Sequence, residues 1–245
     1  MLSIIVPTLN EAATIPRFIQ SLRAQRFQDY ELIVANSPAT VDGTADICQS
    51  HGCVIVKGGK AGEGRNRGAE VARGEILLFL DADVVFPNSQ FLEDVIQEFE
   101  ERHLDVAAPD IAPLSNRLMD RAGYNAYNWY ARFTQRFWPH APGFCMLARR
   151  SVHRIIKGFD ETVAFAEDHE YAQRAHAHGF HFGILVKPEP IQTDMRRFEK
   201  DGWVKTLAVY FWTDIRMKFF GPYRYKTPFT YKMGGEVPDD SKKSS

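Results

Sequence analysis

Two acidic residues directly follow the apolar run Ile76–Leu80, in the sequence Asp81-Ala82-Asp83. Two like charges at the end of a buried strand repel each other and lose hydration, so they need a cation or hydrogen-bond donors nearby. A hard divalent ion that holds a phosphate group meets this need, because it prefers oxygen ligands. The alternative is that the two carboxylates only make a surface loop polar or cap the next helix. Because Asp-x-Asp is common by chance, the motif alone leaves both interpretations open.

The composition is that of an ordinary globular protein. The 245 residues can bury one substantial core, and 44% of them are hydrophobic and 25% charged. The net charge of −1 does not indicate nucleic-acid binding, so we expect no nucleic-acid partner. Three cysteines without a CxxC pair predict neither a disulfide framework nor a zinc site. Residues 1–7 predict a strand and not a signal peptide, and no apolar run approaches the ~20 residues that span a bilayer. We therefore expect a cytoplasmic protein.

The first 110 residues alternate between strand and helix patterns. Apolar, β-branched runs predict strands at residues 3–6, 30–35, 54–56, 76–80 and 104–108. The segments between them predict helices at residues 12–25, 44–51, 64–73 and 91–102. This alternation predicts an α/β fold with a mostly parallel, Rossmann-like sheet. Ligands bind such sheets beyond the carboxyl ends of the strands, so we expect residues 7–11, 36–37 and 81–83 to meet at one edge.

A glycine-rich stretch, residues 57–68, leads into the third of these helices. It is not a P-loop, because no Gly-Lys-Ser/Thr follows, and it does not lie at the first strand–helix turn as a dinucleotide fingerprint does. Backbone N–H groups together with Arg65 and Arg67 at a helix start would suit a diphosphate. A flexible surface loop explains the same glycines.

Six segments, in order along the chain, resemble the family-2 glycosyltransferases with the GT-A fold. They are residues 3–11 (SIIVPTLNE), 64–69 (GRNRGA), 72–83 (ARGEILLFLDAD), 143–150 (GFCMLARR), 158–161 (GFDE) and 167–170 (EDHE). The resemblance covers about residues 2–185. It implies a three-layer GT-A fold and an inverting transferase that uses a nucleotide-diphosphate sugar with Mn²⁺ or Mg²⁺.

Sugar transfer requires that the departing diphosphate is neutralised and that the attacking hydroxyl loses its proton. We assign Asp83 as the direct metal ligand and place Asp81 nearer the ribose or at the metal through water. The metal would stabilise the leaving group as a Lewis acid, and Arg65 would add positive charge beside the phosphates.

The loops after the first two strands would face the nucleotide. Glu11 would hold the base or the ribose, unless it only stabilises the N-terminus of the following helix. Asn36 stands where the family has the first acid of an Asp-rich loop, and an amide donates as well as accepts hydrogen bonds. This departure leaves the donor base, uracil, guanine or thymine, open. The residues assigned to the nucleotide sugar are Pro7, Thr8, Asn10, Glu11, Asn36, Arg65, Asp81, Ala82 and Asp83.

The pair Glu167-Asp168 contains the candidate general base. Residues 165–179 predict a helix with acids in its first turn, so these charges could instead complement the helix dipole, with Arg174 as a partner. By the resemblance, Asp168 takes the proton of the acceptor and Glu167 lies beside the acceptor. A single in-line displacement needs no covalent nucleophile.

Other polar residues have less distinctive patterns. His176, His178 and His181 cluster, but His176 and His178 do not share a helix face, so we interpret these histidines as surface or half-buried residues rather than metal ligands. Asp194 is the candidate for a third protein ligand to the metal. The pair Arg196-Arg197 is a candidate phosphate contact or a solvated charge pair.

We divide the chain into a glycosyltransferase domain at residues 1–195, an extension at 196–232 and a disordered tail at 233–245. The domain has a nucleotide-sugar half, residues 1–110, and an acceptor half, residues 111–195. In residues 114–138 the aromatic residues Tyr127, Tyr130 and Phe137 lie along one helical stripe. Such a stripe predicts core packing, although aromatic faces also suit sugars and lipid interfaces.

The extension, residues 196–232, is expected to be helical, basic and rich in aromatic residues. Its nine Lys and Arg outnumber three acids and alternate with aromatic side chains. Such a segment can lie on an anionic membrane surface. We therefore expect a peripheral contact with the cytoplasmic face of a membrane, and a carbohydrate or lipid-linked acceptor.

Two other functional classes share part of this pattern. A nucleotidyltransferase could have a similar sheet and paired carboxylates, but the chain lacks the glycine-rich loop after the first strand that such enzymes use. A catalytically silent nucleotide-sugar-binding protein would be consistent with Asn36, whereas Asp83 and Asp168 argue against it.

Overall fold

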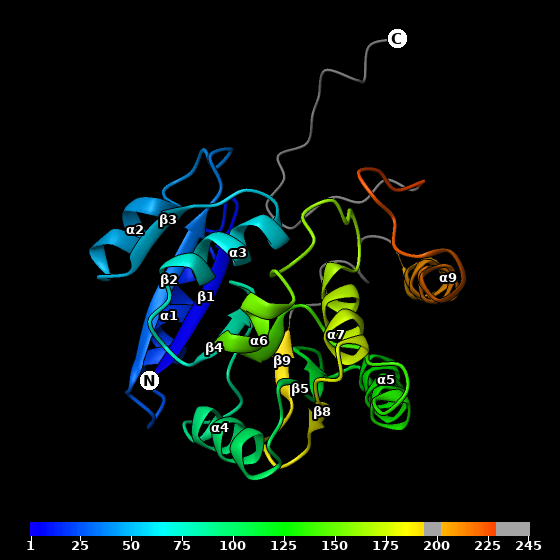
Figure 1. The fold of residues 1–245 in the computed structure, drawn as a ribbon. Helices are drawn as coiled ribbons and strands as arrows, with labels where there is room; N and C mark the ends of the chain where they lie inside the picture. The colour runs from blue at the N-terminus through cyan, green and yellow to red at the C-terminus, as the bar shows by residue number, and fades with distance from the viewer. Residues whose placement is uncertain (194–201, 229–245) are drawn as a thin grey trace.

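The computed structural model of the chain describes residues 1–193 and 202–228 (Figure 1). A seven-stranded sheet has the order β3-β2-β1-β4-β7-β5-β8, in which β7 is antiparallel to both neighbours and the other neighbouring pairs are parallel. A second, two-stranded sheet pairs β6 (Ile111–Pro113) with β9 (Ile191–Thr193). The prediction of a mostly parallel sheet is confirmed. The seven strands are β1 (Leu2–Thr8), β2 (Tyr30–Asn36), β3 (Val54–Lys57), β4 (Ile76–Leu80), β5 (Val106–Pro109), β7 (Cys145–Arg149) and β8 (Phe182–Leu185).

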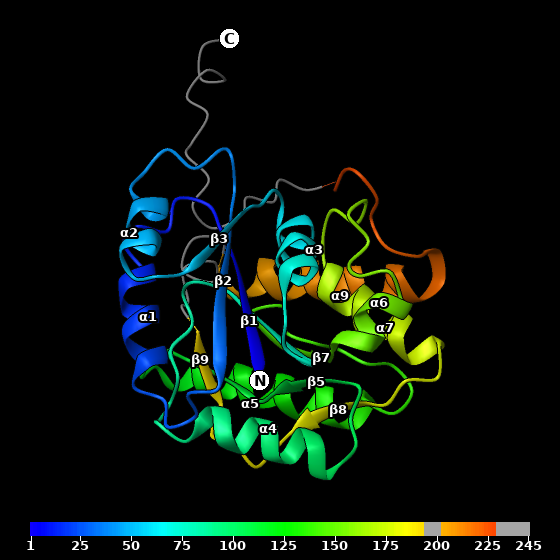
Figure 2. The ribbon, with the colours of Figure 1, turned by 60° about the vertical axis from the view of Figure 1, so that its left-hand side comes forward.

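Helices cover both faces of the large sheet, as the three-layer prediction requires. Alternate residues of β1 point to opposite faces, so Ile4 packs into one core and Ile5 into the other. Figure 2 shows the first two helices on one side of β1–β3 and the third helix on the other. The helices on the Ile4 face are α1 (Ile15–Arg23), α2 (Thr44–Ser50) and α4 (Phe91–Glu101). The Ile5 face carries α3 (Ala61–Val71), α6 (Arg150–Ile155) and α7 (Glu167–Ala177).

Among the helices predicted in the first 110 residues, two start elsewhere than predicted. The first helix begins at Ile15, three residues later than expected, because the backbone N–H groups of Thr14 and Ile15 both donate to the carbonyl of Glu11 in a turn. Pro16 then occupies the first turn of the helix, where its missing N–H does no harm. Glu11 therefore lies just before the helix, where its carboxylate accepts the hydroxyl of the N-cap residue Thr14.

Three glycines of the glycine-rich stretch, Gly62, Gly64 and Gly68, lie inside α3, which begins three residues earlier than predicted. A Cβ at Gly68 would lie 2.3 Å from Ile5 Cγ2, and one at Gly64 would lie 3.0 Å from Pro7 Cβ. These glycines therefore let the helix approach β1 closely. The alternative of a flexible surface loop over residues 57–68 is wrong from residue 61 onward, where close packing explains Gly64 and Gly68, whereas Gly58 and Gly59 do lie between β3 and α3.

The two predicted halves share one sheet, because β7 pairs between β4 and β5. The long helix α9 (Trp203–Phe220) falls in the predicted extension, beside α7 and α5 (Leu118–Thr134) (Figure 1). None of the helices in the described ranges is long and apolar enough to cross a membrane. Residues 194–201 and 229–245, which include Asp194, Arg196, Arg197 and the predicted tail, lie outside the described part of the chain.

Candidate active site

The candidate residues gather where the strand order of the sheet changes direction. The chain proceeds from β1 to β2 and β3 on one side, whereas β4 pairs with the other side of β1. Residues at the carboxyl ends of β1 and β4 border the crevice that this reversal creates, which is where ligands bind open α/β sheets. Pro7 and Thr8 end β1, and Asp81 follows β4 at once. The topology therefore brings these loops to one edge of the sheet, as expected.

Thr8 and Asn36 connect the ends of β1 and β2. The Thr8 hydroxyl donates to Asn36 Oδ1 at 2.9 Å, and the Thr40 hydroxyl donates to the same oxygen at 2.9 Å. The backbone N–H of Ser37 donates to the carbonyl of Thr8 at 2.8 Å. The side-chain oxygen of Asn36 thus holds two loops together.

Asp42, to which the sequence analysis assigned no role, connects the loops that follow β1 and β2. Its carboxylate accepts hydrogen bonds from the backbone N–H groups of Ala12 and Thr44, both at 3.0 Å. The Thr44 hydroxyl in turn accepts the N–H of Glu11 at 2.9 Å. Desolvation raises the pKa of Asp42, but these hydrogen bonds outweigh it and lower the pKa below the ordinary value. An Asp two residues before a helix-starting Thr is the sequence signal that predicts such a turn.

The loop after β1 has a strained backbone at Asn10. Its φ of +54° lies in the left-handed region, which Asn tolerates better than most residues. Asn10 Oδ1 accepts the backbone N–H of Val41 at 2.9 Å, and the buried carboxylate of Glu11 accepts the hydroxyl of Thr14. These bonds hold the residues assigned to the nucleotide in one conformation.

Arg65 joins the acidic motif after β4 to the acidic pair of α7. Its guanidinium pairs with Asp81 at 3.0 Å and with Glu167 at 2.7 Å, and it donates to the carbonyl of Gly143 at 2.8 Å. The side chain is only 3% exposed and lies 5.4 Å from the ring centre of Phe159. Segments separated by up to 102 residues therefore meet at one buried cation.

The negative charges around Arg65 are crowded. Desolvation raises the pKa of Asp81, and so do the carboxylates of Asp83 and Glu167, whereas Arg65 lowers it. The net effect is a raised pKa of Asp81. Because 42% of this side chain stays exposed, water moderates the increase. Burial lowers the pKa of Arg65, but Asp81 and Glu167 outweigh it and raise the pKa above its usual value, so the guanidinium stays charged.

Asp168 lies at the start of α7 against a glycine. Its Oδ1 accepts the N–H of His169 at 2.8 Å, and a Cβ on Gly143 would come within 2.5 Å of its Oδ2. Ala166, the residue before α7, has a φ of +59°, a strained conformation that is common at functional sites. Only glycine at position 143 lets the backbone approach this carboxylate so closely.

Arg174 is not the partner of the candidate base. It pairs with Glu170, with 2.7 Å between Nε and Oε1, on the same helix. Glu167 pairs instead with Arg65, from α3. Arg174 is therefore not the partner of Glu167-Asp168, although both acids do lie in the first turn of α7, where they also complement the helix dipole.

The histidines with metal-ligating geometry are not those that cluster in the sequence. Within residues 1–193 and 202–228, one group of ligand-type side chains converges, and it consists of His140, His169 and Asp214. These residues come from the segment after α5, from α7 and from α9. Because the three residues lie far apart in the sequence, motif spacing could not predict that they meet.

Residues 3–156 of the chain match a family model whose description is "Glycosyl transferase family 2". A "Pre-mycofactocin glycosyltransferase" of Mycobacterium tuberculosis is 27% identical over 225 residues, which cover 85% of this chain and 45% of that protein. The chain spans less than half the length of the curated relatives it matches.

Solved structures share the fold. TarS 1-349 of S. aureus, in complex with UDP-GlcNAc, superposes with a TM-score of 0.64 at 21% identity, covering 79% of this chain and 58% of that one. The mannosyltransferase PcManGT of Pyrobaculum calidifontis, in complex with GDP-Man and Mn²⁺, gives a TM-score of 0.60 at 22% identity, covering 77% and 57%. The resemblance noted in the sequence is confirmed: the chain belongs to glycosyltransferase family 2 and has the GT-A fold.

Proposed function

We propose that this chain transfers a sugar from a nucleoside-diphosphate sugar to an acceptor hydroxyl, by a single displacement that inverts the anomeric carbon. One observation carries the proposal. The buried Arg65 holds Asp81, beside the candidate metal ligand Asp83, and Glu167, beside the candidate base Asp168, in one network. The acids that would face the diphosphate and the acid that would face the acceptor therefore belong to one site. The sugar nucleotides bound by the two solved relatives support the same assignment.

On the donor side, the residues fit a hard divalent cation. Asp81 and Asp83 offer only oxygen atoms, and the charge of Asp83 raises the pKa of Asp81, so a cation there would relieve repulsion. Asp83 is the proposed direct ligand, and Asp81 the ribose-side or water-mediated one. Bound Mn²⁺ or Mg²⁺ would supply positive charge to the leaving diphosphate. The proposed nucleotide contacts are Pro7, Thr8, Asn10, Glu11, Asn36 and Ala82.

Arg65 has a positioning role in this proposal. Its charge is already balanced by Asp81 and Glu167, and its side chain is nearly covered. We therefore assign to it the fixed placement of these two carboxylates, in place of the direct phosphate contact expected from the sequence.

On the acceptor side, Asp168 receives a proton. The acceptor oxygen forms a bond to the anomeric carbon while the bond from that carbon to the diphosphate oxygen breaks. The hydroxyl proton passes to the Asp168 carboxylate, which stands in the first turn of α7 beside Gly143. Glu167 is the neighbour that we place at the acceptor.

Asp83→Asn should weaken Mn²⁺-dependent donor binding by at least about tenfold, which corresponds to roughly 1.4 kcal/mol. The amide keeps the shape of the side chain but removes the charge that attracts the cation. A thermal-shift series with UDP-, GDP- and dTDP-sugars plus Mn²⁺ first identifies the base that raises the Tm of the wild type. The same donor is then titrated against the variant, with Asp94→Asn in the first turn of α4 as the matched control.

Two outcomes of this series would contradict the proposal: no sugar nucleotide raises the Tm of the wild type, or Asp83→Asn binds the donor unchanged. A product assay separates the other functional classes. Release of nucleoside diphosphate that rises with acceptor indicates sugar transfer. Release of pyrophosphate from a nucleoside triphosphate indicates a nucleotidyltransferase, and donor binding without turnover a silent binding protein.

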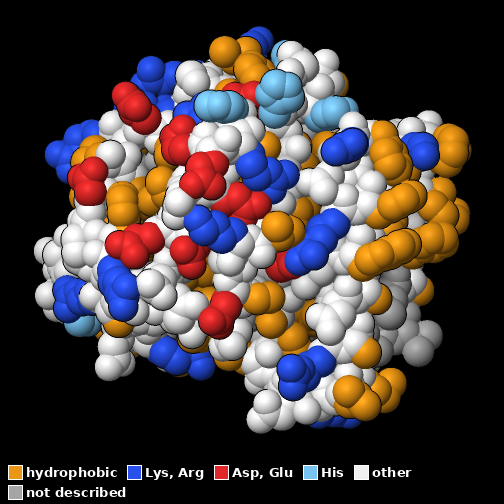
Figure 3. Space-filling model, turned by 90° about the horizontal axis from the view of Figure 1, so that it is seen from below, with side chains coloured by type: hydrophobic (Ala, Val, Ile, Leu, Met, Phe, Trp, Pro, Cys, Tyr) orange, Lys and Arg blue, Asp and Glu red, His pale blue; other side chains and the backbone are white. Residues whose placement is uncertain are grey.

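We also propose that the face carrying α5 and α9 contacts an anionic membrane. Trp129 and Phe133 stack 5.6 Å apart on α5 and are 69% and 64% exposed. Phe137, predicted to pack in the core, is 61% exposed, because α5 ends at Thr134. In Figure 3 hydrophobic side chains gather at the side of the molecule where Figure 1 places α5 and α9, with Lys and Arg among them. Among the residues of α9 whose side chains are described, the exposed large apolar ones are Phe211, Trp212, Phe219 and Phe220.

The double change Trp129→Ser and Phe133→Ser should reduce binding to phosphatidylglycerol-containing vesicles by at least about tenfold. Each aromatic ring contributes roughly 1.5–3 kcal/mol when it leaves water completely, and a partly inserted ring contributes less. Co-sedimentation measures the effect. The control, Val41→Ser with Val71→Ser, removes exposed apolar groups elsewhere. A wild type that does not sediment with these vesicles, or an aromatic variant that sediments equally well, would refute the membrane contact.

A further inference from the structure

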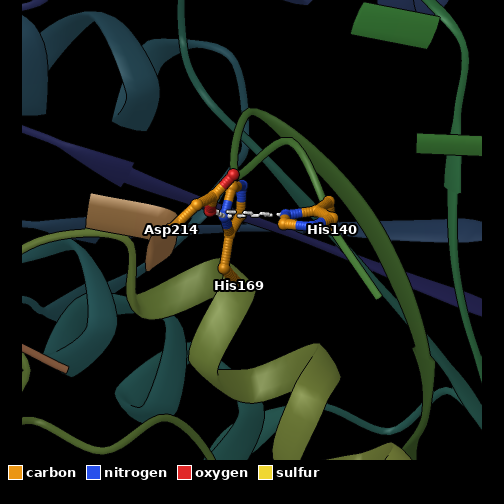
Figure 4. A group of neighbouring side chains, drawn as sticks. All are labelled: His140, His169 and Asp214. Atoms are coloured by element: carbon orange, nitrogen blue, oxygen red, sulfur yellow. Dashed lines mark hydrogen bonds and ion pairs between the residues drawn. The ribbon is translucent and has the colours of Figure 1, made fainter. Parts of the chain in front are cut away.

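We propose that His140, His169 and Asp214 form a second metal site, which takes a Zn²⁺-like transition metal ion and links α9 to the catalytic helix α7. Figure 4 shows the three side chains pointing toward one another from three separate segments. This site is additional to the one proposed at Asp81 and Asp83, and it does not depend on the proposed sugar transfer.

The three ligand atoms already form the triangle that such an ion requires. The Nδ1 atoms of His140 and His169 are 3.4 Å apart, and Asp214 Oδ1 lies 3.5 Å from the first and 3.4 Å from the second. Ligands about 2.0–2.1 Å from a tetrahedral Zn²⁺ are separated by roughly 3.3–3.5 Å. An ion at the centre would therefore require little movement of the side chains.

A hydrogen bond outside the triangle orients His140 as a ligand. Its other ring nitrogen, Nε2, lies 3.2 Å from the Tyr130 hydroxyl, so a proton on Nε2 leaves the lone pair of Nδ1 facing the centre. The His140 side chain is fully buried, and burial lowers its pKa to about 4, which keeps the ring neutral. The side chains of His169 and Asp214 are each 18% exposed, which gives an ion a path of entry and leaves room for water as a fourth ligand.

The surroundings of His169 favour positive charge. Desolvation lowers the pKa of His169, but the charges of Asp168 and Asp214 outweigh it and raise the pKa to about 9. Two imidazoles and one carboxylate favour Zn²⁺ over Mg²⁺, whereas the all-oxygen pair Asp81 and Asp83 favours Mg²⁺ or Mn²⁺.

The location gives the site a consequence for the catalytic helix. His169 follows Asp168 directly, and its N–H donates to the Asp168 carboxylate. An ion held by His169 and Asp214 would fix the backbone beside the candidate base and attach α9 to it. The extension would then be joined to the acceptor side of the site by metal bonds in addition to packing.

Zn²⁺ titration of the EDTA-treated full chain tests the site, with excess Mg²⁺ present to occupy Asp81 and Asp83. Equilibrium dialysis should give one tightly bound Zn²⁺ per chain, and Co²⁺ in its place should show the intense visible absorption of tetrahedral coordination. At 100 times its Kd, Zn²⁺ should raise the Tm by about 5–10 °C. His169→Asn and Asp214→Asn should each weaken binding at least about a hundredfold, which is two steps of 1.4 kcal/mol.

His178→Asn is the matched control, because His178 lies next to the end of α7 and is exposed. Circular dichroism in EDTA verifies that each variant is folded, and two separate ligand variants keep the test valid if one of them fails to fold. Zn²⁺ binding that His169→Asn and Asp214→Asn leave unchanged, or that Asp83→Asn abolishes, would overturn the second site. If the chain binds Zn²⁺ but no sugar nucleotide, the proposed sugar transfer is refuted and the second metal site stands.

Discussion

Replacing Asp168 with Asn is expected to lower the rate of sugar transfer by about 10²–10⁴-fold, while donor binding stays within about twofold of the wild type. The amide keeps the size of the side chain and can still accept the N–H of His169, but it cannot take the proton of the attacking hydroxyl. Only the step that needs a base should therefore fail.

The measurement is turnover with the donor identified by thermal shift, together with a direct titration of that donor. Asp94→Asn makes the same change of charge in the first turn of α4 and should leave turnover unchanged. If Asp168→Asn turns over at a near-normal rate, Asp168 is not the base. If it loses donor binding instead, its role lies on the donor side.

Arg65→Met is expected to lower the free energy of unfolding by about 3–5 kcal/mol. Methionine can keep the apolar contact with Phe159, but it leaves Asp81 and Glu167 without their shared cation. The pKa of Asp81, which burial already raises in the folded protein, should then rise further. The loss of stability should be largest at pH 8 and smaller at pH 5, because Asp81 can take up a proton in the folded state as the pH falls.

The same helix supplies the control. Arg67, two residues further along α3, is 47% exposed and contacts Glu63 and Glu70 at 3.9 Å and 3.4 Å. Exposed pairs of this kind contribute only about 0–1 kcal/mol, so Arg67→Met should change urea unfolding within that range. Equal effects of the two substitutions would show that Arg65 does not hold a buried network.

The strand patterns predicted the sheet because burial on both faces leaves a strong local signal. The apolar run of β4 has the same bounds in the structure as in the prediction, and β1 and β2 are each longer than predicted. Helix starts were less predictable, because a turn at Glu11 delayed α1 and because Gly64 and Gly68 pack against β1 inside α3 and do not form a loop. Hydrogen bonds and close packing with distant residues decided these ends.

The sequence by itself determined the alternation of strands and helices, the acids directly after β4 and the family to which the chain belongs. Only the tertiary structure decided which charges meet. Arg65 and Glu167 are 102 residues apart, and His140, His169 and Asp214 come from three segments that no local period connects. Local patterns record what each segment buries, whereas ion pairs and ligand triangles depend on where the sheet and its helices bring distant side chains together.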